Sequence, residues 1–119
     1  MDDFPEFMRH PYNRIFAKSV QGQGRQGYLF DGADGSQMII WTGETEGRAP
    51  EQAHDFDEYL LVVQGKYTLI IAGEEIPLGS GQEYVIPKGL AHAGEYLAGT
   101  RTIQAYGGRR AKRAIAERV

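Results

Sequence analysis

Short apolar runs separated by glycine-containing turns recur along most of the chain. They are rich in β-branched and aromatic residues, which are typical of strands. Strands are predicted at residues 14–18, 27–31, 37–42, 59–63, 67–71, 83–86, from residue 92 onward and at 101–106. Asp34-Gly35 and Gln64-Gly65 predict tight turns that join neighbouring strands into hairpins. About eight to ten short strands, with little helix before residue 109, predict an all-β fold built as a closed or sandwiched barrel.

The alternation of side chains along each strand predicts which residues face the inside of this barrel. On this basis the inward-facing set is Tyr28, Phe30, Met38, Ile40, Tyr84, Ile86, Gln104 and Tyr106. Trp41 has the opposite parity to Met38 and Ile40 and is predicted on the other face. For each residue of the set, a role in the core is the simplest interpretation. Residues 43–51 are polar and are predicted to form a loop.

The two ends of the chain differ in character from the middle. Two prolines interrupt residues 1–13, which predicts an irregular N-terminal arm. Residues 14–108 form the predicted barrel, and residues 109–119 form a basic C-terminal helix or tail with a few apolar residues at helical spacing. RNA or membrane binding is one interpretation of this tail. A solvated terminal helix that docks a small apolar face on the barrel is the favoured one.

Length and composition limit the classes of protein that this chain can be. A chain of 119 residues forms one domain of ordinary size. It has no cysteine, so a disulfide scaffold and a thiolate metal site are excluded, and any transition metal must be bound by nitrogen and oxygen. Residues 1–108 hold fifteen acidic and eight basic residues, and such an acidic body disfavours nucleic acid as a partner.

Nothing in the sequence predicts a membrane segment or an export signal. The chain starts with an acidic stretch that no apolar run follows, which argues against a secretory signal peptide. Nowhere is an apolar stretch long enough to cross a bilayer. We therefore expect a cytoplasmic protein without a membrane partner.

The segment from Gln52 to Glu58 is polar, although it leads directly into the apolar run at 59–63. At the two-residue period of a strand, one face carries Gln52, His54, Phe56 and Glu58. A helix would also bring together residues four positions apart, so the spacing alone fits both structures, but the apolar run that follows favours a strand. A histidine and a carboxylate on an inward face are candidates for metal binding.

Two motifs in this part of the chain resemble those of the cupin family. The spacing Gly-x5-Pro-x-Gly-x2-His of the second cupin motif is matched by Gly81, Pro87, Gly89 and His92. The first motif, His-x-His-x3-Glu-x6-Gly, is matched by His54, Glu58 and Gly65, while its leading histidine is replaced by Gln52. Both motifs occur in the right order, and the resemblance covers roughly residues 35–107. It implies the cupin double-stranded β-helix, a jelly-roll barrel, in its small single-domain form (a monocupin).

The resemblance also implies a metal site. His54, Glu58 and His92 would be the metal ligands, and Gln52 would take the fourth position through its amide oxygen. Two imidazoles, a carboxylate and an amide leave a divalent ion with net positive charge and with open positions for a substrate. This set of ligands suits Zn, Fe, Mn or Ni. Small cupins usually pair, so we expect a homodimer.

Four residues are candidates for binding a small-molecule substrate, namely Phe56, Tyr96, Gln104 and Tyr106. Phe56 lies between the two ligands of the first motif, and Tyr96 shares the inward parity of His92. Gln104 and Tyr106 are predicted to face inward from the last strand. A mostly apolar pocket needs only a few such polar groups to orient a ligand.

The resemblance leaves three classes of function open. The favoured class is a metal-dependent enzyme of the dioxygenase, isomerase or cyclase type that acts on a small organic substrate in the barrel. The second is a non-catalytic protein that binds or senses a small molecule or a sugar, and the third is a structural dimer with a degenerate site. The fold does not decide among these classes.

Two further features carry no predicted function. Residues 22–27 spell the Gly-x-Gly-x-x-Gly pattern of dinucleotide-binding proteins, but a strand follows where that pattern needs a helix. His10 has no ligand partner nearby in the sequence, so we expect it to be a surface or packing histidine.

Overall fold

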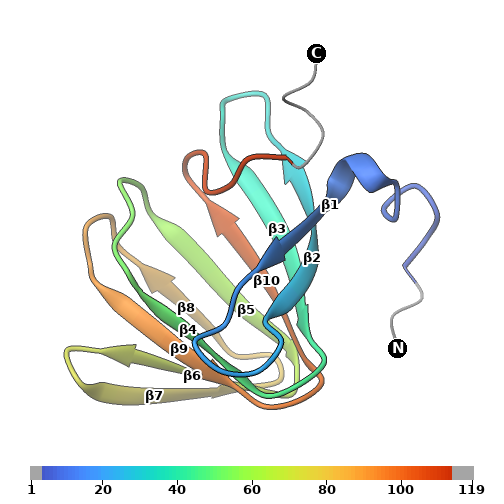
Figure 1. Cartoon of the computed structure of the whole chain (residues 1–119). Coiled ribbons are helices and arrows are strands. Elements are labelled where there is room, and N and C mark those ends of the chain that lie inside the picture. Colours follow the sequence, from blue (N-terminus) through green and yellow to red (C-terminus); the bar gives the residue numbers. More distant parts are fainter. Residues whose placement is uncertain (1–3, 114–119) are drawn as a thin grey trace.

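The computed structural model describes residues 4–113, and in this range it is an all-β structure (Figure 1). A short 3-10 helix, η1 (Pro11–Asn13), precedes the strands. The strands are β1 (Arg14–Ala17), β2 (Arg25–Asp31), β3 (Gln37–Gly43), β4 (Gly47–Gln52), β5 (Glu58–Gln64), β6 (Lys66–Ile71), β7 (Glu74–Gly79), β8 (Glu83–Ile86), β9 (His92–Tyr96) and β10 (Thr100–Tyr106). The predicted fold class is confirmed. No helix of the described residues is long and apolar enough to span a membrane.

The strands form two antiparallel sheets that pack against each other as a jelly-roll barrel. The six-stranded sheet has the order β1-β2-β3-β10-β5-β8, and the four-stranded sheet has the order β4-β9-β6-β7. The main core lies between them and combines side chains of both sheets, namely Leu60, Val62, Tyr67, Leu69, Leu78, Ile86 and Tyr96. Burial of these apolar side chains is the main force that holds the two sheets together.

A second core cluster lies where β1, β2 and β3 extend the six-stranded sheet. Its buried members are Ile15, Leu29, Ile39, Trp41 and Tyr106. The predicted inward set is therefore wrong for β2 and β3, because Leu29, Ile39 and Trp41 are buried whereas Met38 is 44% exposed. Gln104, Tyr106 and Ile86 are buried as predicted, and Tyr84 is half-buried.

Strand register explains this error. Residues that lie opposite each other in an antiparallel pair share a face of the sheet. Ile39 lies opposite Gln104, and Trp41 lies opposite Thr102. An inward Gln104 therefore requires an inward Ile39 and an outward Met38. Both faces of β3 carry apolar side chains, so alternation within the strand alone could not decide between them.

The region that leads to Glu58 also differs from the prediction. The predicted loop 43–51 contains most of β4, which runs over residues 47–52, and residues 53–57, predicted to continue a strand from Gln52, form a bend between β4 and β5. β4 is at the edge of its sheet, and its pairing with β9 shifts register between Ala49 and Gln52. An edge position and a register shift accommodate Pro50, which has no amide proton to donate. This proline and the polar composition concealed the strand.

The chain after β10 does not form the predicted helix. Residues 109–113 are not helical, and the remainder of the predicted helix, with Ala114 and Ile115, lies outside the described residues. This segment is held instead by hydrogen bonds and by Arg113, which reaches η1 and β2. Figure 1 shows η1 and the segment after β10 on the β1–β3 side of the barrel, away from β6 and β7.

Candidate metal centre

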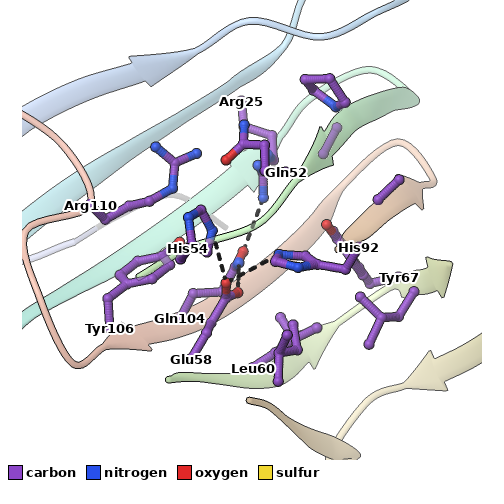
Figure 2. Close-up of a pocket in the computed structure, with 15 residues that line it drawn as sticks. Arg25, Gln52, His54, Glu58, Leu60, Tyr67, His92, Gln104, Tyr106 and Arg110 are labelled. Atoms are coloured by element: carbon purple, nitrogen blue, oxygen red, sulfur yellow. Dashed lines mark hydrogen bonds and ion pairs between the residues drawn. The ribbon is translucent and has the colours of Figure 1, made fainter. Parts of the chain in front are cut away.

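His54, Glu58 and His92 converge on one point inside the barrel. His54 lies in the bend between β4 and β5, while Glu58 begins β5 and His92 begins β9. The Oε1 atom of Glu58 is 3.4 Å from the Nε2 atom of His54 and 3.5 Å from the Nε2 atom of His92. One potential ligand atom from each of the three residues lies within 4.8 Å of the other two (Figure 2).

Hydrogen bonds donated by two backbone amides hold the ligand-bearing segments together. The amide of Gly89 donates to the carbonyl oxygen of His54 at 2.8 Å. The amide of Lys88 donates to the Oδ1 atom of Asp57, also at 2.8 Å. The turn that precedes His92 is thus fixed to the bend that carries His54. Gly89 has a φ of 83°, a conformation that favours glycine at this position of the turn.

The hydrogen bonding of His92 leaves its Nε2 atom facing the site with a lone pair. Its Nδ1 atom lies 2.9 Å from the carbonyl oxygen of Leu90. A carbonyl can only accept, so Nδ1 donates, and the neutral ring then carries its lone pair on Nε2. This lone pair faces the Oε1 atom of Glu58, which is also an acceptor when the carboxyl is ionised. Either a proton or a cation must therefore lie among these atoms.

The pKa values describe the same electrostatic balance. Burial alone would raise the pKa of Glu58, but hydrogen bonds from His54, His92 and Gln104 lower it to about 2. Burial alone would lower the pKa of His92, but the hydrogen bonds to Glu58 and to the Leu90 carbonyl oxygen, together with the charge of Glu58, outweigh burial and raise the pKa of that imidazole. Glu58 is thus held as an anion that favours a positively charged partner.

Gln104 and Arg25 extend the centre as a chain of hydrogen bonds. The Nε2 atom of Gln104 donates to the Oε2 atom of Glu58 at 2.6 Å. Its Oε1 atom accepts from a terminal nitrogen of Arg25 at 3.0 Å and from the Thr102 hydroxyl at 2.9 Å. These two bonds fix the amide so that its NH2 group faces the carboxylate. Gln104 therefore positions Glu58, and Arg25 positions Gln104.

The ligand atoms line a small cavity, which measures about 20 Å³ as the space open to the centre of a water molecule. A volume of roughly 10–15 Å³ on this measure holds one water, so the space suits a single ion or water. Gln52, which pairs with His92 between β4 and β9, lines the same cavity. Arg110 also lines it (Figure 2).

The four substrate-binding candidates divide into two pairs. Gln104 and Tyr106 line the cavity, whereas Phe56 and Tyr96 do not. Phe56 stacks on the outside of the His54 ring with 5.1 Å between ring centroids. Tyr96 is buried in the main core, 6.3 Å from the ring centroid of Tyr67. The structure thus leaves Phe56 and Tyr96 with packing contacts instead of contact with the cavity.

Tyr106 forms one wall of the cavity. Its hydroxyl accepts a hydrogen bond of 3.3 Å from the Trp41 indole, and its ring meets His54 edge-on with 6.0 Å between centroids. Burial, followed by the nearby charge of Glu58, raises the pKa of this phenol well above its usual value. Tyr106 is therefore a neutral side chain that positions His54.

A larger cavity of about 470 Å³ adjoins the metal-ligand cavity. The two cavities share four lining residues, Arg25, Pro50, Gln52 and Arg110. A volume of this size is in the range of small-molecule sites, roughly 300–1,000 Å³. The shared residues place it next to the candidate metal centre, where a substrate can approach the ligand atoms.

Arg25 and Arg110 were not predicted from the sequence, because a charged residue is ordinarily expected at the surface. Arg25 has the same strand parity as the fully buried Leu29, and this is the one signal that indicates an inward arginine. Arg110 follows the last strand, where no periodic pattern applies. His10 is exposed, as predicted, and its Nδ1 atom accepts from the amide of Tyr12.

Comparisons with known proteins agree with this architecture. No curated protein matches the chain. Among solved structures, KdgF from Halomonas sp. is similar with a TM-score of 0.67 and 19% identity, and the match covers 81% of this chain and 94% of that protein. An RmlC-like cupin from Shewanella frigidimarina NCIMB 400 is similar with a TM-score of 0.65 and 15% identity, and here 90% and 99% of the two chains are covered. Such identities show the fold alone.

The EutQ protein of Clostridium difficile has the same fold, with a TM-score of 0.58, 18% identity and 82% of each chain covered. The cupin domain family matches residues 37–109, which include both motifs and all candidate ligands. This match extends over more than half of the chain and coincides with the two-sheet barrel. The chain therefore belongs to the cupin family.

Proposed function

We propose that the protein binds a divalent transition-metal ion through His54, Glu58 and His92, with Gln52 in the fourth position, and acts there as a metal-dependent enzyme on a small organic molecule. The observation that carries this proposal is the direction of two imidazole Nε2 atoms toward one buried carboxylate oxygen. When bound, such an ion supplies Lewis-acid polarisation of an oxygen-bearing substrate or a site for O2.

The donor set supports this assignment. Two nitrogen donors and one carboxylate oxygen suit Zn, Fe, Mn or Ni, and the small volume beside them suits a single ion. The bond from His92 to the Leu90 carbonyl oxygen is the kind of outer contact that fixes ring orientation in metal sites. Gln104 has the same role toward Glu58.

A ligand-binding or sensing protein without catalysis is the second candidate, and one observation favours it. Apart from the candidate ligands, the titratable side chains among the described residues that line the metal-ligand cavity are two tyrosines and two arginines. Burial raises the pKa of both tyrosines. None of the four is suited to accept a proton near neutral pH, so chemistry at this site would depend on the ion and not on a side-chain base.

Metal content tests the proposal. Protein purified without chelators and then supplied with Zn, Fe, Mn or Ni should hold about one ion per chain by elemental analysis. His54→Ala and His92→Ala should lose it, whereas His10→Ala should keep it because His10 is exposed and lies outside the cluster. Equal metal content in all three variants, or none in the original protein, would overturn the proposal.

We also infer a homodimer that pairs through the outer face of the six-stranded sheet. An apolar depression of about 540 Å³ on this face is lined by Phe30, Met38, Val85 and Ala105 among others, and Val85 is 60% exposed. Apolar surface of this kind is typical of association sites. Sedimentation should give a dimer mass for the original protein and a monomer mass for Met38→Glu. Val20→Glu is the control and should stay a dimer, because Val20 is an exposed apolar residue that does not line the depression. A monomer mass of the original protein at all concentrations would contradict the inference.

A further inference from the structure

The larger cavity beside the candidate metal centre has a one-sided charge. Its lining includes four basic residues, Lys18, Arg25, Arg110 and Lys112, and no acidic residue among those that the structure describes. This is unexpected in a chain with more acidic than basic residues. The cavity therefore has a positive potential that favours an anionic occupant.

Arg25 is buried without a carboxylate partner. It is 6% exposed, and no carboxylate of the described residues forms a salt bridge with it. A guanidinium has five N–H donors, but within the described residues Arg25 makes one hydrogen bond, of 3.0 Å, to the neutral amide of Gln104. A buried charge normally has a partner of opposite charge, so this guanidinium retains donors for one.

Aromatic rings hold the Arg25 guanidinium in place. Its central carbon lies 4.8 Å from the ring centroid of Trp41 and 5.5 Å from that of Tyr96. Contacts of this kind fix the plane of a guanidinium while leaving N–H groups at its edge. Arg25 is thus preorganised, which lowers the entropic cost of binding an anion.

Arg110 adds a second guanidinium where the two cavities adjoin. It lines both cavities together with Arg25, and Figure 2 shows both arginines on the same side of the cavity as Gln52. Its backbone amide donates to Gln37 at 2.7 Å, and its guanidinium lies 5.9 Å from the Tyr106 ring. The two arginines therefore flank the route between the outer cavity and the metal ligands.

We propose that Arg25 and Arg110 form a binding site for the acidic group of the substrate, which is a small organic acid whose other oxygen atoms reach the metal centre. This inference rests on the proposed function. A planar carboxylate matches the donors of a guanidinium, and a phosphate group shares this chemistry. A divalent ion bound by one carboxylate and two neutral imidazoles leaves the adjoining cavity with further positive charge, which favours the same class of ligand.

Calorimetric titration of the metal-loaded protein tests the proposal. Malate carries a chelating hydroxy-acid end and a second carboxylate, lactate carries the chelating end alone, and lactamide is its neutral analogue. Malate should bind more tightly than lactate, and lactamide should not bind. Inorganic phosphate is titrated separately. If phosphate binds more tightly than malate, the site is a phosphate site; if malate binds more tightly, it is the carboxylate site proposed.

Arginine variants assign the site. Arg110→Gln and Arg25→Gln should weaken malate binding by about 10- to 100-fold each, the loss expected for a charge-assisted hydrogen bond. Arg48→Gln is the matched control, because Arg48 is an exposed arginine paired with Glu95 outside both cavities. Arg110 is only half-buried, so Arg110→Gln keeps the test decisive if Arg25→Gln does not fold. Unchanged malate affinity in Arg110→Gln would overturn the proposal.

The same titrations separate this inference from the proposed metal site. In protein treated with a chelator, malate or phosphate should still bind weakly, and Arg110→Gln should still reduce that binding. Binding that depends on Arg110 in a protein without metal affinity would support the anion site and contradict the metal site. Metal binding together with a malate affinity that Arg110→Gln leaves unchanged would support the metal site and contradict the anion site.

Discussion

Arg113 and Arg25 are two buried arginines whose surroundings differ in kind. Arg113 is 7% exposed and Arg25 is 6% exposed. Arg113 forms a salt bridge of 2.8 Å with Asp31 and donates to the carbonyl oxygens of Tyr12 and Leu29. Arg25 instead contacts one neutral amide, that of Gln104, and the rings of Trp41 and Tyr96. A guanidinium with its partners supplied by the chain stabilises the fold, while one with spare donors is available to a ligand.

The largest expected effect is on stability, and it separates the two arginines. Arg113→Gln should lower the free energy of unfolding by about 2–3 kcal/mol, which is less than the roughly 3–5 kcal/mol for a fully buried pair because Asp31 is half exposed. Arg25→Gln should change it by less than about 1 kcal/mol, since an amide can still donate to Gln104. Urea denaturation measures both values. A larger loss in Arg25→Gln than in Arg113→Gln would reverse the comparison.

The pH dependence of stability provides a second comparison, between Asp31 beside Arg113 and Glu58 at the metal centre. The pKa of Asp31 is lowered by its hydrogen bond from Gln37, against burial and with the help of Arg113, while the pKa of Glu58 falls to about 2. For both groups the folded pKa is below the unfolded one. Their contributions are therefore present above the unfolded values, near 4, and each is lost as the pH falls through the folded pKa, which is about 2 for Glu58.

The metal centre should show a further change in stability as the pH rises above 6.5. The pKa of His92 is raised above 6.5, so in metal-free protein its contribution is present below pH 6.5 and is lost as the pH rises through the folded pKa. Bound metal requires neutral imidazoles, so stabilisation by the ion should grow over the same range. Melting temperatures from pH 5 to 9, with and without Zn, measure this. An effect of Zn that does not change with pH would contradict the assignment of His92.

A smaller effect, on metal affinity, is expected from changing Gln104, which links Arg25 to Glu58. Gln104→Leu removes the hydrogen bond to Glu58 and should weaken metal affinity by about 10- to 100-fold, as for other outer contacts of metal ligands. Competition with a chromophoric chelator measures this affinity. Gln64→Leu is a matched control, because the Gln64 amide bonds to the Gly99 carbonyl oxygen away from the centre. Equal metal affinity in both variants would show that the hydrogen-bond chain from Arg25 through Gln104 to Glu58 does not affect metal binding.

The smallest predicted change concerns the residue that replaces the first histidine of the motif. Imidazole is a stronger donor than an amide oxygen for the metals considered. Gln52→His should therefore tighten metal binding if residue 52 is a ligand, as measured with the same chelator. Unchanged affinity would make Gln52 a wall of the two cavities that it lines.

Motif spacing predicted the convergence of His54, Glu58 and His92, although the predicted strand from 52 to 58 is a bend. The spacing succeeded because it encodes a whole local structure, whereas the two-residue period describes only a strand. The all-β fold followed from turn glycines and β-branched runs. Such local signals do not depend on which strands pair.

What the sequence could not predict depends on contacts between distant segments. The buried faces of β2 and β3 follow from their register with β10, and β4 exists because β9 pairs with it. Arg25 is buried, and its guanidinium donates to Gln104, which is far away in the sequence. In each case the deciding partner is remote along the chain, and no local pattern identifies it.

The bond between the Gly89 amide and the carbonyl oxygen of His54 has a practical consequence. Because this amide reports directly on the segment that carries a candidate ligand, its hydrogen-exchange rate can serve as a native sensor of order at the centre. Exchange at residue 89 should slow when an ion is added, without a label on any ligand, and the amides of the β6–β7 hairpin provide an internal reference.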